Sequence, residues 1–204
     1  MLCITLLLVP AAFSQFRLPR HTITGDVGAA IPGQDLRGAF EPSFAIGPHY
    51  GYRFHRYFEA NAGFDTAIQS ARVDDYVYTE FGARRIRDYQ IFLPFGGRVI
   101  IPTPGERWHF FAGGGGVYVR YYEAISQPSR YFRIDCPQCS ARSGVGYYGL
   151  AGFRWRPNPY SRFWIGASAR VVRVETDGDS IGELIVRPTR DRWITPMMEF
   201  GFSF

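Results

Sequence analysis

The sequence predicts an all-β fold, an eight-stranded antiparallel transmembrane β-barrel with up-and-down meander topology. Three observations predict it: apolar residues recur at every second position, short and long connections alternate along the chain, and aromatic residues gather near the ends of the expected strands. Composition agrees, because aromatics make up 17% and the chain has 23 glycines. Aromatics favour pleated strands, and glycines suit turns and close backbone approaches.

The first fifteen residues, "MLCITLLLVPAAFSQ", predict an export signal. An apolar run is followed by Ala12-Phe13-Ser14, which fits the small-x-small rule for cleavage before Gln15. The run is too short to span a bilayer as a helix, which needs about 20 apolar residues. We therefore expect residues 1–14 to be removed and residues 15–204 to form a single barrel domain. An uncleaved anchor is the alternative.

The expected strands follow from period-two alternation. In "RDYQIFLPFGGRVII", Tyr89, Ile91 and Leu93 fall on one face, while Gln90 and Arg98 fall on the other. Applied along the chain, the pattern predicts eight strands, at 22–31, 42–54, 57–68, 88–101, 108–122, 144–156, 160–174 and 193–204.

The connections between these strands alternate in length. Residues 55–56, 102–107 and 157–159 make short turns, whereas 32–41, 69–87, 123–143 and 175–192 are longer, polar and charged. This is the plan of bacterial outer-membrane barrels, which have tight turns on the periplasmic side and longer loops outside.

Aromatic residues form two bands that predict interfacial girdles. One band flanks the short turns: Phe54, Tyr57, Phe58, Trp108, Phe110, Phe111, Trp155, Tyr160, Phe163 and Trp164. The other lies near the long loops: Tyr89, Tyr121, Tyr122, Tyr147 and Trp193.

Charged residues fall on the less apolar face of the strands. We expect this face to line the lumen, because an arginine facing lipid in mid-strand costs about 2–4 kcal/mol. A lumen of eight strands is just wide enough for side chains to fill. The sequence thus predicts a closed lumen with Arg–carboxylate pairs; a charged gate in a narrow pore is the alternative. The residues of this network are Arg53, Glu59, Asp65, Arg98, Arg120, Arg154, Arg170 and Glu199.

Cys136 and Cys139 form a CxxC pair in the long segment 123–143. Such a pair can be a redox site, half of a zinc site or a disulfide. No histidine is suitably spaced to complete a zinc site, and the βαβ setting of a thioredoxin-type pair is missing. In the oxidising environment after export, we expect a local disulfide that closes the tip of a loop.

The sequence predicts no catalytic site, no metal site and no cofactor. His49 and His109 have no serine clearly placed beside them on a strand face. The run "AGGGG" is not followed by the Lys-Ser/Thr of a phosphate-binding loop. Every one of the 23 basic residues is an arginine, and the net charge is +5, but these arginines are scattered, which argues against nucleic-acid binding.

The motifs "FFAGGGGVYV", "GYYGLAGFRW" and the terminal "MMEFGFSF" resemble those of small bacterial outer-membrane β-barrel proteins, the OmpA/OmpX-like group with a porin-type barrel domain. The resemblance covers essentially the whole mature chain. It implies a monomer in the outer membrane of a Gram-negative cell envelope, in contact with membrane lipids and lipopolysaccharide. It also implies recognition by periplasmic chaperones and the barrel-assembly machinery, with the assembly signal at Met198, Phe200, Phe202 and Phe204.

For function, this resemblance implies a structural, adhesive or small-solute pore role. Two alternatives remain open at this point. One is a membrane-embedded lipid hydrolase or acyltransferase, and the other is a soluble, periplasmic, lipocalin-like barrel with an apolar interior. Arginine clusters in the long loops are either a site for lipopolysaccharide phosphates or ordinary solvated charge.

Overall fold

The computed structural model describes residues 19–68, 76–79, 82–125, 139–181 and 187–204. The expected export signal lies outside these residues and stays a prediction. All eight expected strands are confirmed, with bounds within a few residues at most ends. The elements are β1 (His21–Gln34), the 3-10 helix η1 (Asp35–Arg37), β2 (Ser43–His55), β3 (Phe58–Gly63), β4 (Asp65–Ile68), β5 (Tyr76–Thr79), β6 (Gly82–Pro102), β7 (Trp108–Ile125), β8 (Ala141–Trp155), β9 (Phe163–Gly178) and β10 (Thr189–Ser203).

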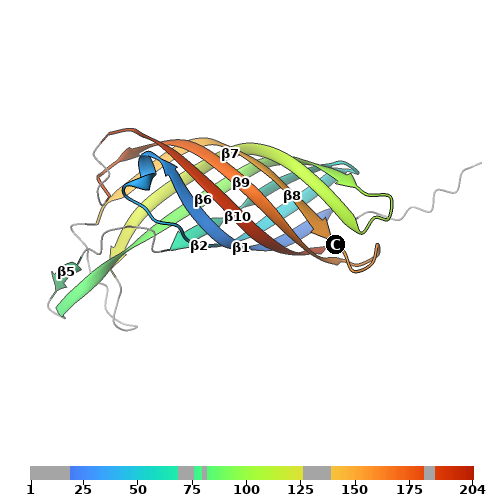
Figure 1. Cartoon of the computed structure of the whole chain (residues 1–204), viewed down its shortest axis with the longest axis horizontal. Coiled ribbons are helices and arrows are strands. Elements are labelled where there is room, and N and C mark those ends of the chain that lie inside the picture. The colour runs from blue at the N-terminus through green and yellow to red at the C-terminus, as the bar shows by residue number, and fades with distance from the viewer. Residues whose placement is uncertain (1–18, 69–75, 80–81, 126–138, 182–186) are drawn as a thin grey trace, which may run out of the picture.

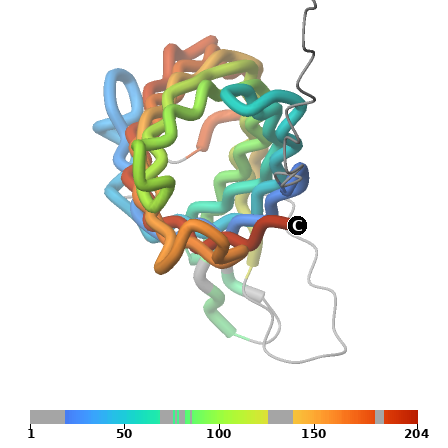
Figure 2. The backbone as a smooth tube through the Cα atoms, turned by 90° about the vertical axis from the view of Figure 1, so that its right-hand side faces the viewer, coloured from blue at the N-terminus to red at the C-terminus, as the bar shows by residue number. Residues whose placement is uncertain are grey.

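The strands form a closed antiparallel ring (Figures 1 and 2). β1 pairs with both β2 and β10, and the backbones of His21 and Phe204 exchange two hydrogen bonds at this seam. The expected strand 57–68 is split at Phe64 into β3 and β4, which both pair with β2 and β6 and so share one place in the ring of eight. Closure leaves no strand edge unpaired around the barrel.

Two strands are longer than expected at the end that carries the long connections, which we call the loop end. β6 has 21 residues and β7 has 18. β5 pairs with the first part of β6 beyond the ring (Figure 1). At about 3.3 Å per residue, a strand as long as β6 exceeds a hydrocarbon layer of about 30 Å even when tilted. Among the described residues, no helix is long and apolar enough to cross a membrane.

The two faces of the barrel wall differ sharply. On β10, Met198, Phe200 and Phe202 point outward and are roughly half exposed, whereas Glu199 between them points inward and is buried. The same alternation places apolar side chains outside on the other strands and most of the buried charges inside. A soluble lipocalin-like barrel has the opposite arrangement, which argues against that alternative.

The aromatic bands are only partly what the sequence predicted. Trp108, Phe110, Phe163 and most others of the turn-side band lie on the outer surface. Four residues assigned to the girdles are instead buried: Phe111, Tyr121, Trp164 and Trp193. Position along a strand does not by itself decide which face a residue occupies, because successive side chains alternate between faces.

Candidate functional site

The loop end of the lumen is filled by the connection between β1 and β2. This segment turns inward at η1, and its Leu36 and Phe40 are almost completely buried. The Phe40 ring lies 5.7 Å from that of Tyr121 and 5.9 Å from that of Trp193. Sequence reasoning treated residues 32–41 as a polar external loop; the apolar residues of "LRGAF" were the available signal.

Trp193 is at the centre of this aromatic layer and is fully buried. Its indole nitrogen donates a 2.8 Å hydrogen bond to the Tyr121 hydroxyl, and its ring meets Phe92 edge-on at 5.7 Å. The layer satisfies the one polar atom of the tryptophan, which aromatic packing in a core requires. Nearer the loop end, the buried Arg142 donates to the backbone carbonyls of Thr176 and Arg187.

The middle of the lumen holds a charged cluster around Asp65. Arg170 forms an ion pair with Asp65, and the His49 Nε2 atom lies 2.7 Å from Asp65 Oδ1 and 3.3 Å from Asp26 Oδ2. Asp26, His49 and Asp65 bring three potential metal ligands within 4.8 Å of one another. However, Arg170 lies 3.5 Å from the same His49 nitrogen and already supplies a positive charge to the cluster. We therefore assign these residues to an ion-pair network.

A second charged cluster, centred on Glu59, lies nearer the end with the short connections, which we call the turn end. The Glu59 carboxylate is fully buried and faces three arginines. Arg98 donates to it through Nε at 2.7 Å, Arg154 through two nitrogens at 3.4 Å, and Arg53 lies at 3.6 Å. Arg154 also approaches Glu199 at 3.8 Å.

Aromatic rings support these arginines. The Arg154 guanidinium lies over the Trp164 ring at 4.2 Å, and both Arg98 and Arg154 lie 5.1 Å from the centre of the Phe111 ring. A cation over an aromatic face is stabilised, the more so when water is excluded. Trp164 fits there because position 201 is glycine: a Cβ at Gly201 would overlap the indole ring.

The structure thus brings together seven of the eight residues predicted for the network, in the pairs Arg53–Glu59, Arg98–Glu59, Arg154–Glu59, Arg154–Glu199 and Arg170–Asp65. Arg120 is the exception and the prediction for it is wrong. It is exposed on the outer face of β7, where Val119 and Tyr121 are the residues that point inward. Gly114 and Gly116 have the same parity as Arg120 and also face outward.

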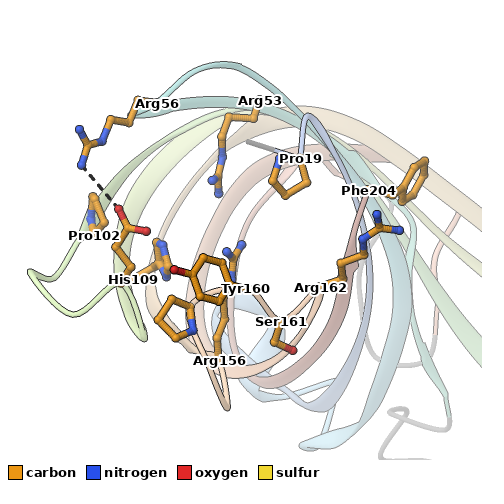
Figure 3. A pocket seen from close by; sticks show the side chains of 12 residues that line it. Pro19, Arg53, Arg56, Pro102, His109, Arg156, Tyr160, Ser161, Arg162 and Phe204 are labelled. Carbon is orange, nitrogen blue, oxygen red and sulfur yellow. Dashed lines mark ion pairs between the residues drawn. The ribbon is translucent and has the colours of Figure 1, made fainter. Parts of the chain in front are cut away.

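Beyond the Glu59 cluster, the turn end opens into a cavity of about 540 Å³ (Figure 3). We call it the vestibule. It is lined from β2, the β2–β3 turn, the β6–β7 turn, the β8–β9 turn and the β1–β10 seam by Pro19, Arg53, Arg56, Pro102, Glu106, His109, Arg156, Pro159, Tyr160, Ser161, Arg162 and Phe204. Burial, reinforced by the neighbouring Arg154 guanidinium, lowers the pKa of Arg156.

Comparison with solved structures gives matches at very low sequence identity. The chain is similar to Neisserial surface protein A (12% identity, 90% of this chain and 97% of that chain covered, TM-score 0.56). It is also similar to the attachment invasion locus protein Ail of Yersinia pestis (13%, 92% and 99%, TM-score 0.54) and to the outer membrane protein OprG of Pseudomonas aeruginosa (13%, 92% and 97%, TM-score 0.57). The chain has the fold of the small outer-membrane β-barrels. No protein-family model matches it, and no curated protein matches it in sequence.

Two other groups of residues predicted from the sequence are the terminal aromatic stripe and the cysteine pair. Met198, Phe200, Phe202 and Phe204 all lie on the outer surface, about half exposed, but their part in assembly stays a prediction. Cys136 lies outside the described residues, so the Cys136–Cys139 disulfide also stays a prediction.

Proposed function

We propose that this chain is an outer-membrane protein with a non-conducting lumen and a structural or adhesive role at its loop end. The filled lumen carries the proposal. The aromatic layer around Trp193 and the cluster around Glu59 lie in series along the axis. The cavity between them, lined by Asp26, His49 and Arg170, has a volume of about 10 Å³, which is room for about one water molecule.

The membrane location is supported by the outer surface. On β6, β7, β9 and β10, outward side chains are apolar or glycine over most of the strand from the turn end. Each strand then presents an arginine toward the loop end: Arg87, Arg120, Arg173 and Arg192. Arginines at the edge of an apolar band suit the phosphate groups of lipopolysaccharide or lipid headgroups, which guanidinium groups bind bidentately.

The adhesive role is supported by the β5–β6 extension and by one structural neighbour. The name of Ail refers to attachment and invasion, and one of its structures is a complex with the heparin analogue sucrose octasulfate. In this chain, Arg87 and Arg190 are exposed at the loop end, where they are accessible to sulfated or phosphorylated sugars.

The experiment that tests the filled lumen is planar-bilayer recording of the purified protein. We expect no discrete openings from preparations whose folding is verified by heat-modifiable gel migration. Reproducible unitary currents would contradict the proposal and favour the charged gate. Fractionation tests the location: recovery of the protein entirely in the soluble periplasm would overturn the membrane assignment.

Adhesion is tested separately by binding to immobilised heparin at fixed ionic strength. Arg87→Gln together with Arg190→Gln is expected to reduce retention. Arg20→Gln together with Arg107→Gln, which makes the same charge change at exposed positions of the turn end outside the vestibule, is expected to leave it unchanged. Equal losses in both double variants would reduce the effect to net charge and contradict a loop-end site.

The assembly signal is tested by deletion of Phe204. This deletion is expected to lower the yield of membrane-inserted protein in cells while leaving refolding into detergent largely intact. Unchanged insertion would contradict a recognition role for the terminal aromatic residue.

A further inference from the structure

The vestibule at the turn end has an excess of positive charge. Four arginines line it, Arg53, Arg56, Arg156 and Arg162, together with a single side-chain carboxylate from Glu106. The Glu106 carboxylate forms an ion pair with the Arg56 guanidinium, at 3.8 Å between Oε1 and Nη2 on the exposed rim. It is the one ion pair drawn in Figure 3. Among the described residues, Arg53 is the only one of the other three that lies within ion-pair distance of a carboxylate, as the most distant of the three partners of Glu59.

Arg156 is the residue for which a ligand explains most. Its side chain is more than nine-tenths buried, yet among the described residues its guanidinium has no carboxylate within ion-pair distance. A buried charge without a partner is costly, so such groups are nearly always paired or bound to a ligand. Arg53 also lines the vestibule (Figure 3), and its Nε atom is buried with no hydrogen-bond acceptor among the described residues.

His109 adds a third unsatisfied group in the same wall. Its side chain is buried, and its Nδ1 atom has no hydrogen-bond partner in the described part of the chain. Guanidinium and imidazole groups that converge on one space match the oxygen atoms of a phosphate, which accepts several charge-assisted hydrogen bonds at once.

The size and walls of the vestibule indicate what else the ligand carries. About 540 Å³ lies within the range of sites for small organic ligands and is far more than one phosphate group requires. Pro102, Pro159 and Tyr160 provide apolar and aromatic surface around the arginines. A ligand that fits therefore combines one doubly charged group with an uncharged body of about the size of a sugar ring.

We propose that the vestibule is a binding site for a soluble phosphate monoester of sugar size. Arg53, Arg156 and His109 bind the phosphate at the inner end, and the ring of Tyr160 and the neighbouring prolines contact the body of the ligand. Arg162, which is exposed on the β8–β9 turn, adds positive charge at the entrance. The site lies at the opposite end of the barrel from the adhesive surface and does not depend on the adhesive role.

Isothermal titration calorimetry of the folded protein in detergent tests the proposal, with three probes at constant ionic strength: glucose 1-phosphate, inorganic phosphate and glucose. Glucose 1-phosphate is expected to bind most tightly, inorganic phosphate more weakly, and glucose without measurable heat. Arg156→Gln is expected to weaken the binding of glucose 1-phosphate by about tenfold or more, as loss of a charged hydrogen-bond donor does. Arg162→Gln, in an exposed turn where folding is not at risk, is expected to weaken it by a smaller factor.

Arg37→Gln is the matched control, because it removes the same charge from an exposed position at the loop end, in η1. Unchanged affinity in this control, with loss in the two vestibule variants, supports the site. Equal losses in all three variants would reduce binding to general electrostatic attraction and overturn the proposal. Equal affinity for phosphate and glucose 1-phosphate would contradict the claim that the site also recognises a sugar-sized body. No binding of any probe would overturn the site itself.

Discussion

The two ends of the barrel are built in opposite ways. At the turn end, arginines Arg53, Arg98 and Arg154 are inside the wall, and large aromatic residues such as Trp108 and Phe163 are outside. At the loop end, the interior is aromatic around Trp193, and the outward positions of four strands carry arginines. Arg142 is the buried exception there, and its guanidinium donates to backbone carbonyl groups.

For the proposed outer-membrane protein, this inversion indicates where the bilayer would begin and end along the barrel. An outward arginine is costly near the bilayer centre but nearly neutral at the interface, whereas an outward aromatic residue is favourable in both places. The apolar band starts at the turn end and stops below the outward arginines, so the proposed membrane location would leave the first parts of β6 and β10 in water. Inside the barrel, lipid imposes no such rule, and the two ends fill the lumen by different means.

Removal of the central carboxylate should have the largest effect on stability. Glu59→Gln leaves Arg53, Arg98 and Arg154 close together without their shared counter-ion. Because breaking one side of a buried ion pair costs about 3–5 kcal/mol, we expect a loss of that size in the free energy of unfolding, measured by urea titration in detergent. Glu175→Gln, in an exposed pair with Arg190, is the control and should cost less than about 1 kcal/mol. Equal effects would contradict the network.

Removal of the Trp193 side chain at the loop end should lower the free energy of unfolding nearly as much, but through lost packing. Trp193→Ala empties the centre of the aromatic layer and leaves the Tyr121 hydroxyl without its donor. Large aromatic-to-alanine changes in a core cost about 3–5 kcal/mol. The variant should still be silent in bilayer recordings, because the Glu59 cluster remains in series. Appearance of unitary currents would place the only barrier at the loop end.

A smaller effect is expected where a glycine makes room for a buried ring. Gly201→Ala places a methyl group against the Trp164 indole. The same indole ring lies under the Arg154 guanidinium. Overpacking of this kind costs about 1–3 kcal/mol. Gly25→Ala on the neighbouring strand β1 meets no atom within 4 Å and should leave the urea midpoint unchanged. An equally large loss of stability in Gly25→Ala would show that the effect comes from replacing a glycine in the strand backbone and not from contact with the Trp164 ring.

Sequence reasoning predicted the barrel and most of its lumen charges because alternation records which side of a strand meets water or lipid. It could not predict partners: Glu59 and Arg154 are far apart in sequence, and their contact depends on the register of several strands. It also could not predict that residues 36–40 fold into the lumen, because this depends on contacts with Tyr121 and Trp193, which are far away in the sequence.

The sequence also did not predict correctly which residues of β7 point inward. The run Gly113–Gly116 has no side chains to mark a face, and both parities carry aromatics on the turn side of it. Counting from the turn therefore assigned Arg120 to the interior. The buried residues Val117, Val119 and Tyr121 set the true phase, but apolar residues there fit either an inward layer or the lipid face.

The corrected position of Arg120 predicts the smallest effect of all. An arginine on the outer face near the interface contributes about 0–1 kcal/mol, so Arg120→Leu should hardly change the free energy of unfolding. Arg170→Leu is the matched comparison, because it removes the lumen partner of Asp65 and should cost about 3–5 kcal/mol. Urea titration of both variants in the same detergent gives the two values directly. A loss for Arg120→Leu as large as that for Arg170→Leu would indicate that Arg120 faces the lumen. The loop end of β7 would then have no outward arginine, and the contrast between the two ends of the barrel would not hold for this strand.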